Sequence, residues 1–90
     1  MLVQYRYSET DFVAYLLTLG LEYDKIETCW STTSGKKTFA YFTFDMDKLI
    51  QYQNEFASGL ATVNALLYAK NRKSVAKEMR ESFNSFVSNN

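Results

Sequence analysis

The side chains that carry most enzymatic chemistry are scarce in this 90-residue sequence. It has no histidine and a single cysteine, Cys29, which excludes His-based triads, the ordinary zinc sites and the usual general base near neutral pH. Cys29 follows Thr28 in a predicted strand, where a lone cysteine is more often a small packing residue than a reactive thiol. The three glycines are isolated, so no phosphate-cradling glycine loop occurs. We therefore expect neither catalysis nor a cofactor.

Two acidic pairs have a spacing that suits a divalent cation: Asp45 with Asp47, and Glu9 with Asp11. Both pairs lie at predicted helix starts, where carboxylates stabilise the partial positive charge of the helix end. Helix stabilisation is the simpler explanation for both. We expect no metal site.

A row of basic side chains near the C-terminus is the first candidate binding surface. It consists of Lys70, Lys73, Lys77 and Arg80. In a helix of about 100° per residue these four side chains fall within one narrow sector beside the apolar stripe. The row suits nucleic-acid phosphates or an acidic protein partner, and the alternative is a solvated helix face in which Lys77 pairs with Glu81. Arg72 points toward the stripe, so we expect it to snorkel or to meet a carboxylate from the acidic first half of the chain.

An aromatic face of the predicted sheet is the second candidate. If Trp30, Phe42 and Phe44 point into the core, Phe39 and Tyr41 point away from it. The proposed set of aromatics on that face is Tyr5, Tyr7, Tyr23, Phe39 and Tyr41. Exposed, they would stack unpaired bases or form the centre of a protein interface. The alternative, which we favour, is that the long last helix covers this face as a second layer of core.

Composition indicates one globular domain over residues 1–90, with a disordered tail at 88–90. The chain is 47% hydrophobic, 17% aromatic and 22% charged, enough to bury a core and keep a polar surface. Its formal net charge is zero, which argues weakly against a dedicated nucleic-acid binder. The charges are unevenly spread, with five basic and eight acidic residues up to Gly59 and five basic and two acidic residues beyond it.

The single cysteine also bears on the compartment, because small secreted domains usually need disulfides. The apolar run from Phe12 to Leu21 is too short to span a bilayer, and the N-terminus lacks the features of a signal peptide. We expect a cytoplasmic protein that does not enter the membrane.

Periodicity predicts an α+β fold in the order β-α-β-β-α-α, a small antiparallel sheet with a long C-terminal helix. Residues 2–7 and 22–32 alternate as strands, and a third strand over 36–44 follows a turn at Ser34-Gly35. A capping box of Ser8 and Asp11 predicts a helix that ends at Gly20. Asp45 predicts the start of a second helix that ends at Gly59, with an inward stripe of Met46, Leu49, Ile50, Gln53 and Phe56.

The last predicted helix starts near residue 62 or 64 and ends at Val87. Its apolar stripe comprises Ala65, Tyr68, Val75, Met79, Phe83 and Phe86. At about 1.5 Å per residue this helix is over ~30 Å long, more than the rest of the fold needs. We expect its C-terminal half to project or to pair with a second copy.

The order of these signals resembles a family of short bacterial, plasmid and phage domains of unknown function. The shared features are the helix pattern D-F-V-A-Y-L-L-T-L-G at residues 11–20, the F-T-F-D end of the hairpin at 42–45 and the F-A-S-G helix end at 56–59. The shared residues are structural: helix caps, aromatic residues of strands and glycines at helix ends. The resemblance implies a phage or mobile-element context and no activity.

The sequence therefore predicts a small non-enzymatic interaction protein, and the resemblance implies a phage or mobile-element accessory factor. Its partner would be a host protein or a second copy of itself as a homodimer, bound through the long helix and the exposed aromatics. The alternative is nucleic-acid binding by the basic row, with base stacking on the sheet.

Overall fold

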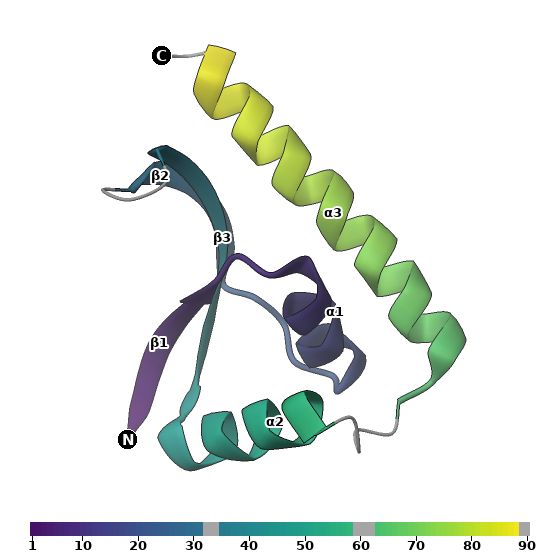
Figure 1. Ribbon diagram of the computed structural model, residues 1–90. Helices are drawn as coiled ribbons and strands as arrows, with labels where there is room; N and C mark the ends of the chain where they lie inside the picture. The colour runs from purple at the N-terminus through teal and green to yellow at the C-terminus, as the bar shows by residue number, and fades with distance from the viewer. Residues whose placement is uncertain (32–34, 59–62, 89–90) are drawn as a thin grey trace.

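The computed structural model describes residues 1–31, 35–58 and 63–88. Its elements in chain order are β1 (Leu2–Tyr7), α1 (Thr10–Thr18), β2 (Lys25–Ser31), β3 (Gly35–Asp45), α2 (Met46–Ser58) and α3 (Ala65–Ser88) (Figure 1). The predicted α+β class and element order are confirmed. The predicted turn residue Ser34, the predicted helix end at Gly59 and residues 89 and 90 of the predicted tail lie outside the described residues, whereas Ser88 belongs to α3.

Strand β3 lies in the middle of a three-stranded antiparallel sheet, between β1 and β2. The register places Tyr5 opposite Phe42 and Ile26 opposite Ala40. Residues directly opposite each other in an antiparallel pair share a face. The core face therefore carries Val3, Tyr5, Tyr7, Ile26, Thr28, Trp30, Ala40, Phe42 and Phe44. The outer face carries Gln4, Arg6, Lys25, Glu27, Cys29, Lys37, Phe39, Tyr41 and Thr43.

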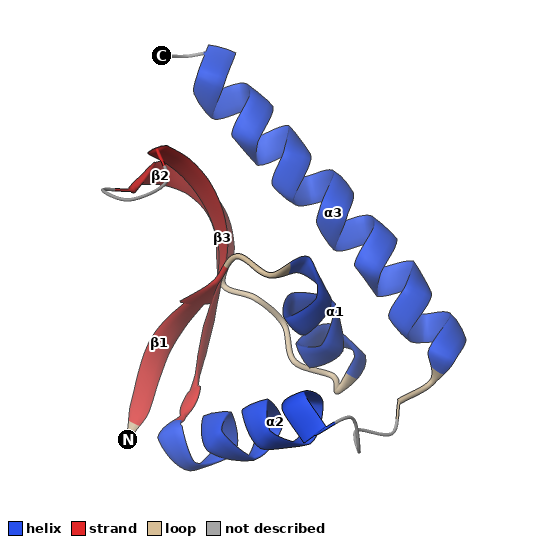
Figure 2. Cartoon of the chain, viewed as in Figure 1, coloured by secondary structure: helices blue, strands red, loops and turns tan. Residues whose placement is uncertain are grey.

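Helices α1 and α3 lie on the core face of the sheet, and α2 packs at the end of the sheet where β3 finishes (Figure 2). Helix α1 runs between the sheet and α3, so five consecutive residues, 12–16, are buried. A helix that is covered from two sides buries more than the single apolar stripe of a surface helix. Within the described ranges, no helix covers the outer face.

The two ends of α1 differ in how well the sequence predicts them. Gly20 has φ of +96°, and the amide of Leu21 donates to the carbonyl of Leu16 while that of Gly20 donates to Leu17. This is the Schellman arrangement that a glycine after a helix favours. The predicted capping box is wrong, because the N-cap residue is Glu9 and it makes no side-chain cap bond. The Asp11 carboxylate instead binds Arg72.

Helix α2 presents a different face to the core from the predicted one. Leu49 is buried and Tyr52 and Phe56 are half-buried. The other predicted stripe residues, Met46, Ile50 and Gln53, are exposed. Tyr52 packs edge-on against Phe44 at 6.0 Å between ring centroids, which rotates the helix toward its 49-52-56 side.

Helix α3 begins where Asn64 caps it, since the Asn64 side-chain oxygen accepts a hydrogen bond from the amide of Leu67 at 2.9 Å. Val75 and Met79 are its buried residues. Its C-terminal half does not project freely, because the Ser82 hydroxyl lies 3.0 Å from that of Thr28 and Phe86 packs on Trp30. Of the predicted stripe, Ala65 is exposed and Phe83 is 37% exposed.

Candidate functional site

The basic row lies on the side of α3 that faces away from the core. Lys70, Lys73, Lys77 and Arg80 are all exposed. Lys77 stands two residues from both Val75 and Met79, the two buried residues of the helix. Side chains two positions apart in a helix differ in direction by about 200°, so Lys77 points almost directly away from the core. The row is therefore farther from the buried stripe than the sequence predicts.

The cations of this row have no acidic partner in the described part of the chain. The ion pairs there join Met1 to Asp45, Lys25 to Glu27 and Arg72 to Asp11. The pair of Lys77 with Glu81, which belonged to the alternative of a solvated helix face, is not among them. Arg72 does meet a carboxylate from the acidic half, as predicted, with 2.5 Å between its Nε and Asp11 Oδ1. The row is thus four exposed positive charges that form no ion pair with the residues that the structure describes.

Small residues form the floor between these long side chains. Ala69, Ser74 and Ala76 lie among Lys70, Arg72, Lys73, Lys77 and Arg80, and together they line an open hollow of about 790 Å³ on α3. An extended or helical segment can approach a helix backbone closely over alanine, while lysine and arginine reach around its sides. This geometry suits an elongated partner that carries negative charge.

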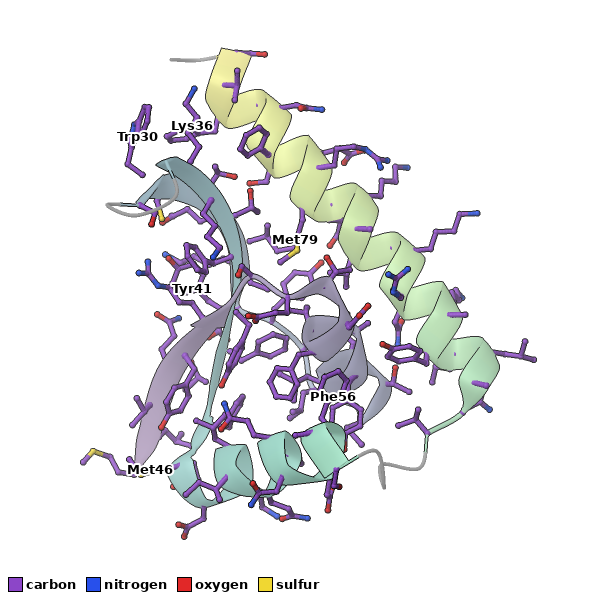
Figure 3. The ribbon with its side chains drawn as sticks, viewed as in Figure 1. Trp30, Lys36, Tyr41, Met46, Phe56 and Met79 are labelled. Atoms are coloured by element: carbon purple, nitrogen blue, oxygen red, sulfur yellow. The ribbon has the colours of Figure 1, made fainter. Side chains whose placement is uncertain are left out.

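Apolar side chains remain exposed near the C-terminal end of the same helix. Phe83 and Val87 are 37% and 41% exposed, and Trp30, at the end of β2, is 66% exposed. Trp30 meets Phe86 edge-on at 6.2 Å between ring centroids, and the Lys36 ammonium lies 5.1 Å from its ring. Figure 3 shows Trp30 and Lys36 together at this end of the molecule. We call Trp30, Phe83, Phe86 and Val87 the apolar end.

The predicted aromatic face is divided between the two sides of the sheet. Phe39 and Tyr41 lie on the outer face, as expected. Tyr5 and Tyr7 lie on the core face, and Tyr23 packs edge-on against Phe42 and donates a hydrogen bond to Glu78 on α3. The interpretation of one row of five exposed aromatics is therefore wrong. The favoured alternative is wrong as well, since α3 packs on the core face.

The two aromatic rings of the outer face are covered by cations of the chain itself. The Arg6 guanidinium lies 4.3 Å from the centroid of Phe39, and the Lys25 ammonium lies 4.7 Å from that of Tyr41. A hydrogen bond to Tyr41 raises the pKa of Arg6, and Arg6 Nη1 also lies 3.8 Å from Cys29 Sγ. Cys29 is thus a half-buried thiol under Arg6, away from the core. A base could stack on these rings only after displacing Arg6 and Lys25.

The two candidate surfaces face opposite ways. Figure 3 shows Tyr41 on the side of the sheet away from α3 and Met79 on the side of α3 that faces the sheet. The exposed row on α3 and the ring of Tyr41 are therefore separated by the full thickness of the fold. A nucleic-acid strand that lies along the row does not reach the outer aromatics. The combined site that the sequence suggested is not brought together.

Two features of the sheet differ from what the sequence predicts. Arg6 and Lys25 cover the outer rings, and this arrangement depends on the strand register, which the sequence does not reveal. The sequence of β1 does indicate that Tyr5 and Tyr7 point inward, because the polar residues Gln4 and Arg6 alternate with them. That alternation places the tyrosines on the buried side.

The acidic pairs considered as cation ligands have other roles in this fold. Asp45 Oδ1 lies 2.9 Å from the N-terminal ammonium group, and Asp11 binds Arg72. In the ranges that the structure describes, no three acidic or cysteine side chains converge as a metal site would require.

Comparison with known proteins gives no family to which the chain could be assigned. No protein-family model, curated protein or solved structure matches it. The resemblance to short bacterial, plasmid and phage domains stays a prediction. None of the described helices has the length and apolar character needed to cross a membrane.

Proposed function

We propose that this chain is a non-catalytic protein-binding module whose exposed side of α3 binds an acidic segment of a partner protein. The observation that carries the proposal is the exposed row from Lys70 to Arg80, which forms no ion pair with the described residues and surrounds the small side chains of Ala69, Ser74 and Ala76. Charges of this kind steer association and set the orientation of a partner of opposite charge.

The apolar end favours a protein partner over nucleic acid. Trp30, Phe83 and Val87 are exposed at the end of the helix that carries the row, and aromatic residues with arginine are enriched at the centres of protein interfaces. Nucleic-acid binding would leave these apolar groups in water. The basic row is also far from Phe39 and Tyr41, the only rings on the outer face of the sheet that the structure describes. Arg6 and Lys25 already cover these two rings, so bases could not stack on them while phosphates contact the row.

The partner is a protein of the host cell or a second copy of this chain. Because the first half of the sequence carries the excess of acidic residues, a second copy has the required charge. Light scattering of the purified chain separates the two cases. A dimer that dissociates when the row is reversed in charge identifies a second copy, and a monomer directs the search to other proteins.

The direct test is a charge reversal with a matched control. Lys73→Glu, Lys77→Glu and Arg80→Glu together alter the row. Lys25→Glu, Lys37→Glu and Lys48→Glu change the net charge equally but lie on the sheet and α2. For a partner captured from extracts of the native cell and then purified, we expect the first variant to bind at least about tenfold more weakly.

The control variant should bind that partner like the unaltered chain. Treating the extract with nuclease before capture separates direct protein binding from bridging by nucleic acid. The proposal is contradicted if both variants lose affinity equally, or if capture disappears after nuclease treatment.

The cellular setting forms part of the proposal. We propose that the chain acts in the cytoplasm, since its single cysteine allows no internal disulfide. A phage or mobile-element accessory factor is the role that the sequence resemblance supports. Neither statement is needed for the test of α3.

A further inference from the structure

A hollow between β1, α1 and α2 is lined by aromatic rings. Its volume is about 280 Å³, and its lining residues are Tyr7, Glu9, Phe12, Gln53, Phe56 and Ala57. Helix α2 buries Leu49 and leaves Phe56 half-buried, in contact with Phe12 of α1. Figure 3 shows Phe56 pointing from α2 toward α1.

Three rings in this hollow meet at steep angles. Tyr7 and Phe12 are 4.9 Å apart between centroids at an interplanar angle of 70°, and Phe12 and Phe56 are 5.3 Å apart, also at 70°. Phe12 is only 6% exposed and forms the floor, while Tyr7 and Phe56 form the walls. Rings at steep angles to one another turn ring surfaces in more than one direction around the corner that they share.

The electrostatics of this corner differ from those of the other surface rings. Phe39, Tyr41 and Trp30 each have a cation of the same chain within 5.1 Å of the ring centroid. The hollow has neither lysine nor arginine in its lining, but it has the carboxylate of Glu9. That carboxylate forms no ion pair with any residue that the structure describes.

We infer that this hollow binds a small organic cation, a methylated ammonium ion of about the size of choline. Ring faces attract a cation within about 6 Å of their centroids, and the attraction grows when water is displaced. Glu9 supplies the compensating negative charge, and Gln53 adds a polar group to the lining. The volume is sufficient for a trimethylammonium group with a short chain. This site lies on elements other than α3 and does not depend on the proposed protein binding.

The test compares choline with 3,3-dimethylbutan-1-ol, a neutral molecule of the same shape. Each compound is titrated into the isotopically labelled full chain, and amide and aromatic chemical shifts are followed by NMR. We expect shifts confined to the six lining residues and their neighbours, with choline binding at least about fivefold more tightly than the neutral compound. Equal binding of the two compounds, or no shift at the hollow with either, overturns the inference.

Variants assign the effect to the rings and the carboxylate. Phe56→Leu keeps an apolar side chain but removes a ring, and we expect choline binding to weaken about fivefold. Phe83→Leu removes a ring from α3 and should leave choline binding unchanged. If Phe56→Leu disturbs the fold, Glu9→Gln, which changes an exposed residue, still reports on the carboxylate and should weaken choline but not the neutral compound. An unchanged preference for choline in Glu9→Gln contradicts the assigned role.

Discussion

Arg72 on α3 and Asp11 at the start of α1 join two helices that are 61 residues apart in sequence, with 2.5 Å between Arg72 Nε and Asp11 Oδ1. Beside this pair, the Tyr68 hydroxyl donates a hydrogen bond to the Asp11 carbonyl at 3.3 Å. The pair links α3 to the start of α1, and the buried Val75 and Met79 hold α3 against the core. The side of α3 that carries the basic row is thereby left exposed.

The Arg72–Asp11 pair should contribute modestly to stability. Both side chains are more than half exposed, and exposed ion pairs are typically worth about 0.2–1 kcal/mol. We expect Asp11→Asn and Arg72→Met each to lower the free energy of unfolding by no more than about 1 kcal/mol. A double-mutant cycle by urea denaturation, at low and high salt, measures the coupling. A coupling that is absent at low salt would show that the pair does not hold the helices together.

Burial along α3 predicts a sharp contrast between two truncations. Met79 is 8% exposed, and its sulfur accepts a weak hydrogen bond from the Thr10 hydroxyl, whereas Leu66 is 85% exposed. Met79→Ala should cost about 2–4 kcal/mol of unfolding free energy through lost packing and a cavity. Leu66→Ala should stay within about 0.5 kcal/mol. Similar losses for the two variants, measured by thermal and urea unfolding, would mean that α3 is not packed as described.

Removing the hydroxyl of Tyr5 or Tyr7 should affect stability in the opposite direction from removing that of Tyr15. The hydroxyls of Tyr5 and Tyr7 are buried and have no hydrogen-bond partner among the described residues, whereas the Tyr15 hydroxyl donates to Glu55 at 3.2 Å. We expect Tyr5→Phe and Tyr7→Phe to be neutral or stabilising by up to about 1 kcal/mol. Tyr15→Phe should be destabilising by about 1 kcal/mol. Urea midpoints of the three variants, compared with the unaltered chain, test the order.

Alkaline pH should weaken the fold through Tyr7. Burial, followed by the nearby Tyr5 and Glu9, raises the pKa of Tyr7 from 10.0 to about 12. Between these two values the unfolded chain loses the proton while the folded chain keeps it, so the unfolded state binds fewer protons and stability falls as pH rises. Below pH 10 the tyrosine is neutral in both states, so it does not make the free energy of unfolding depend on pH. The decline from pH 10 to pH 12 should be smaller in Tyr7→Phe, as measured by urea midpoints.

The sequence predicts the elements well because their signals are local. The period-two alternation of the strands, the apolar run of α1 and Gly20 at its end each depend on neighbouring residues. The failures involve partners distant in sequence. Asp11 does not take the expected capping role, since Glu9 is the N-cap residue and the Asp11 carboxylate binds Arg72. The buried face of α2 includes the contact of Tyr52 with Phe44.

The candidate sites were less predictable than the fold. Helical spacing correctly gathers Lys70, Lys73, Lys77 and Arg80 on one exposed side. Which side of the sheet each aromatic occupies depends on strand register and on the placement of α3, neither of which is local. The hollow at Tyr7 and Phe56 depends on how far α2 stands from α1, which follows from packing across three elements.

The central claim is that the exposed side of α3 contacts a protein partner, and site-specific photocrosslinking tests it most directly. A photoreactive amino acid replaces Ala76, on the floor of the hollow, and in a second variant replaces Thr43, on the outer face of the sheet. After irradiation in the native cell, we predict a protein adduct from position 76, resistant to nuclease, and none from position 43. An adduct from position 43 alone, or a nucleic-acid adduct from position 76, would contradict the account.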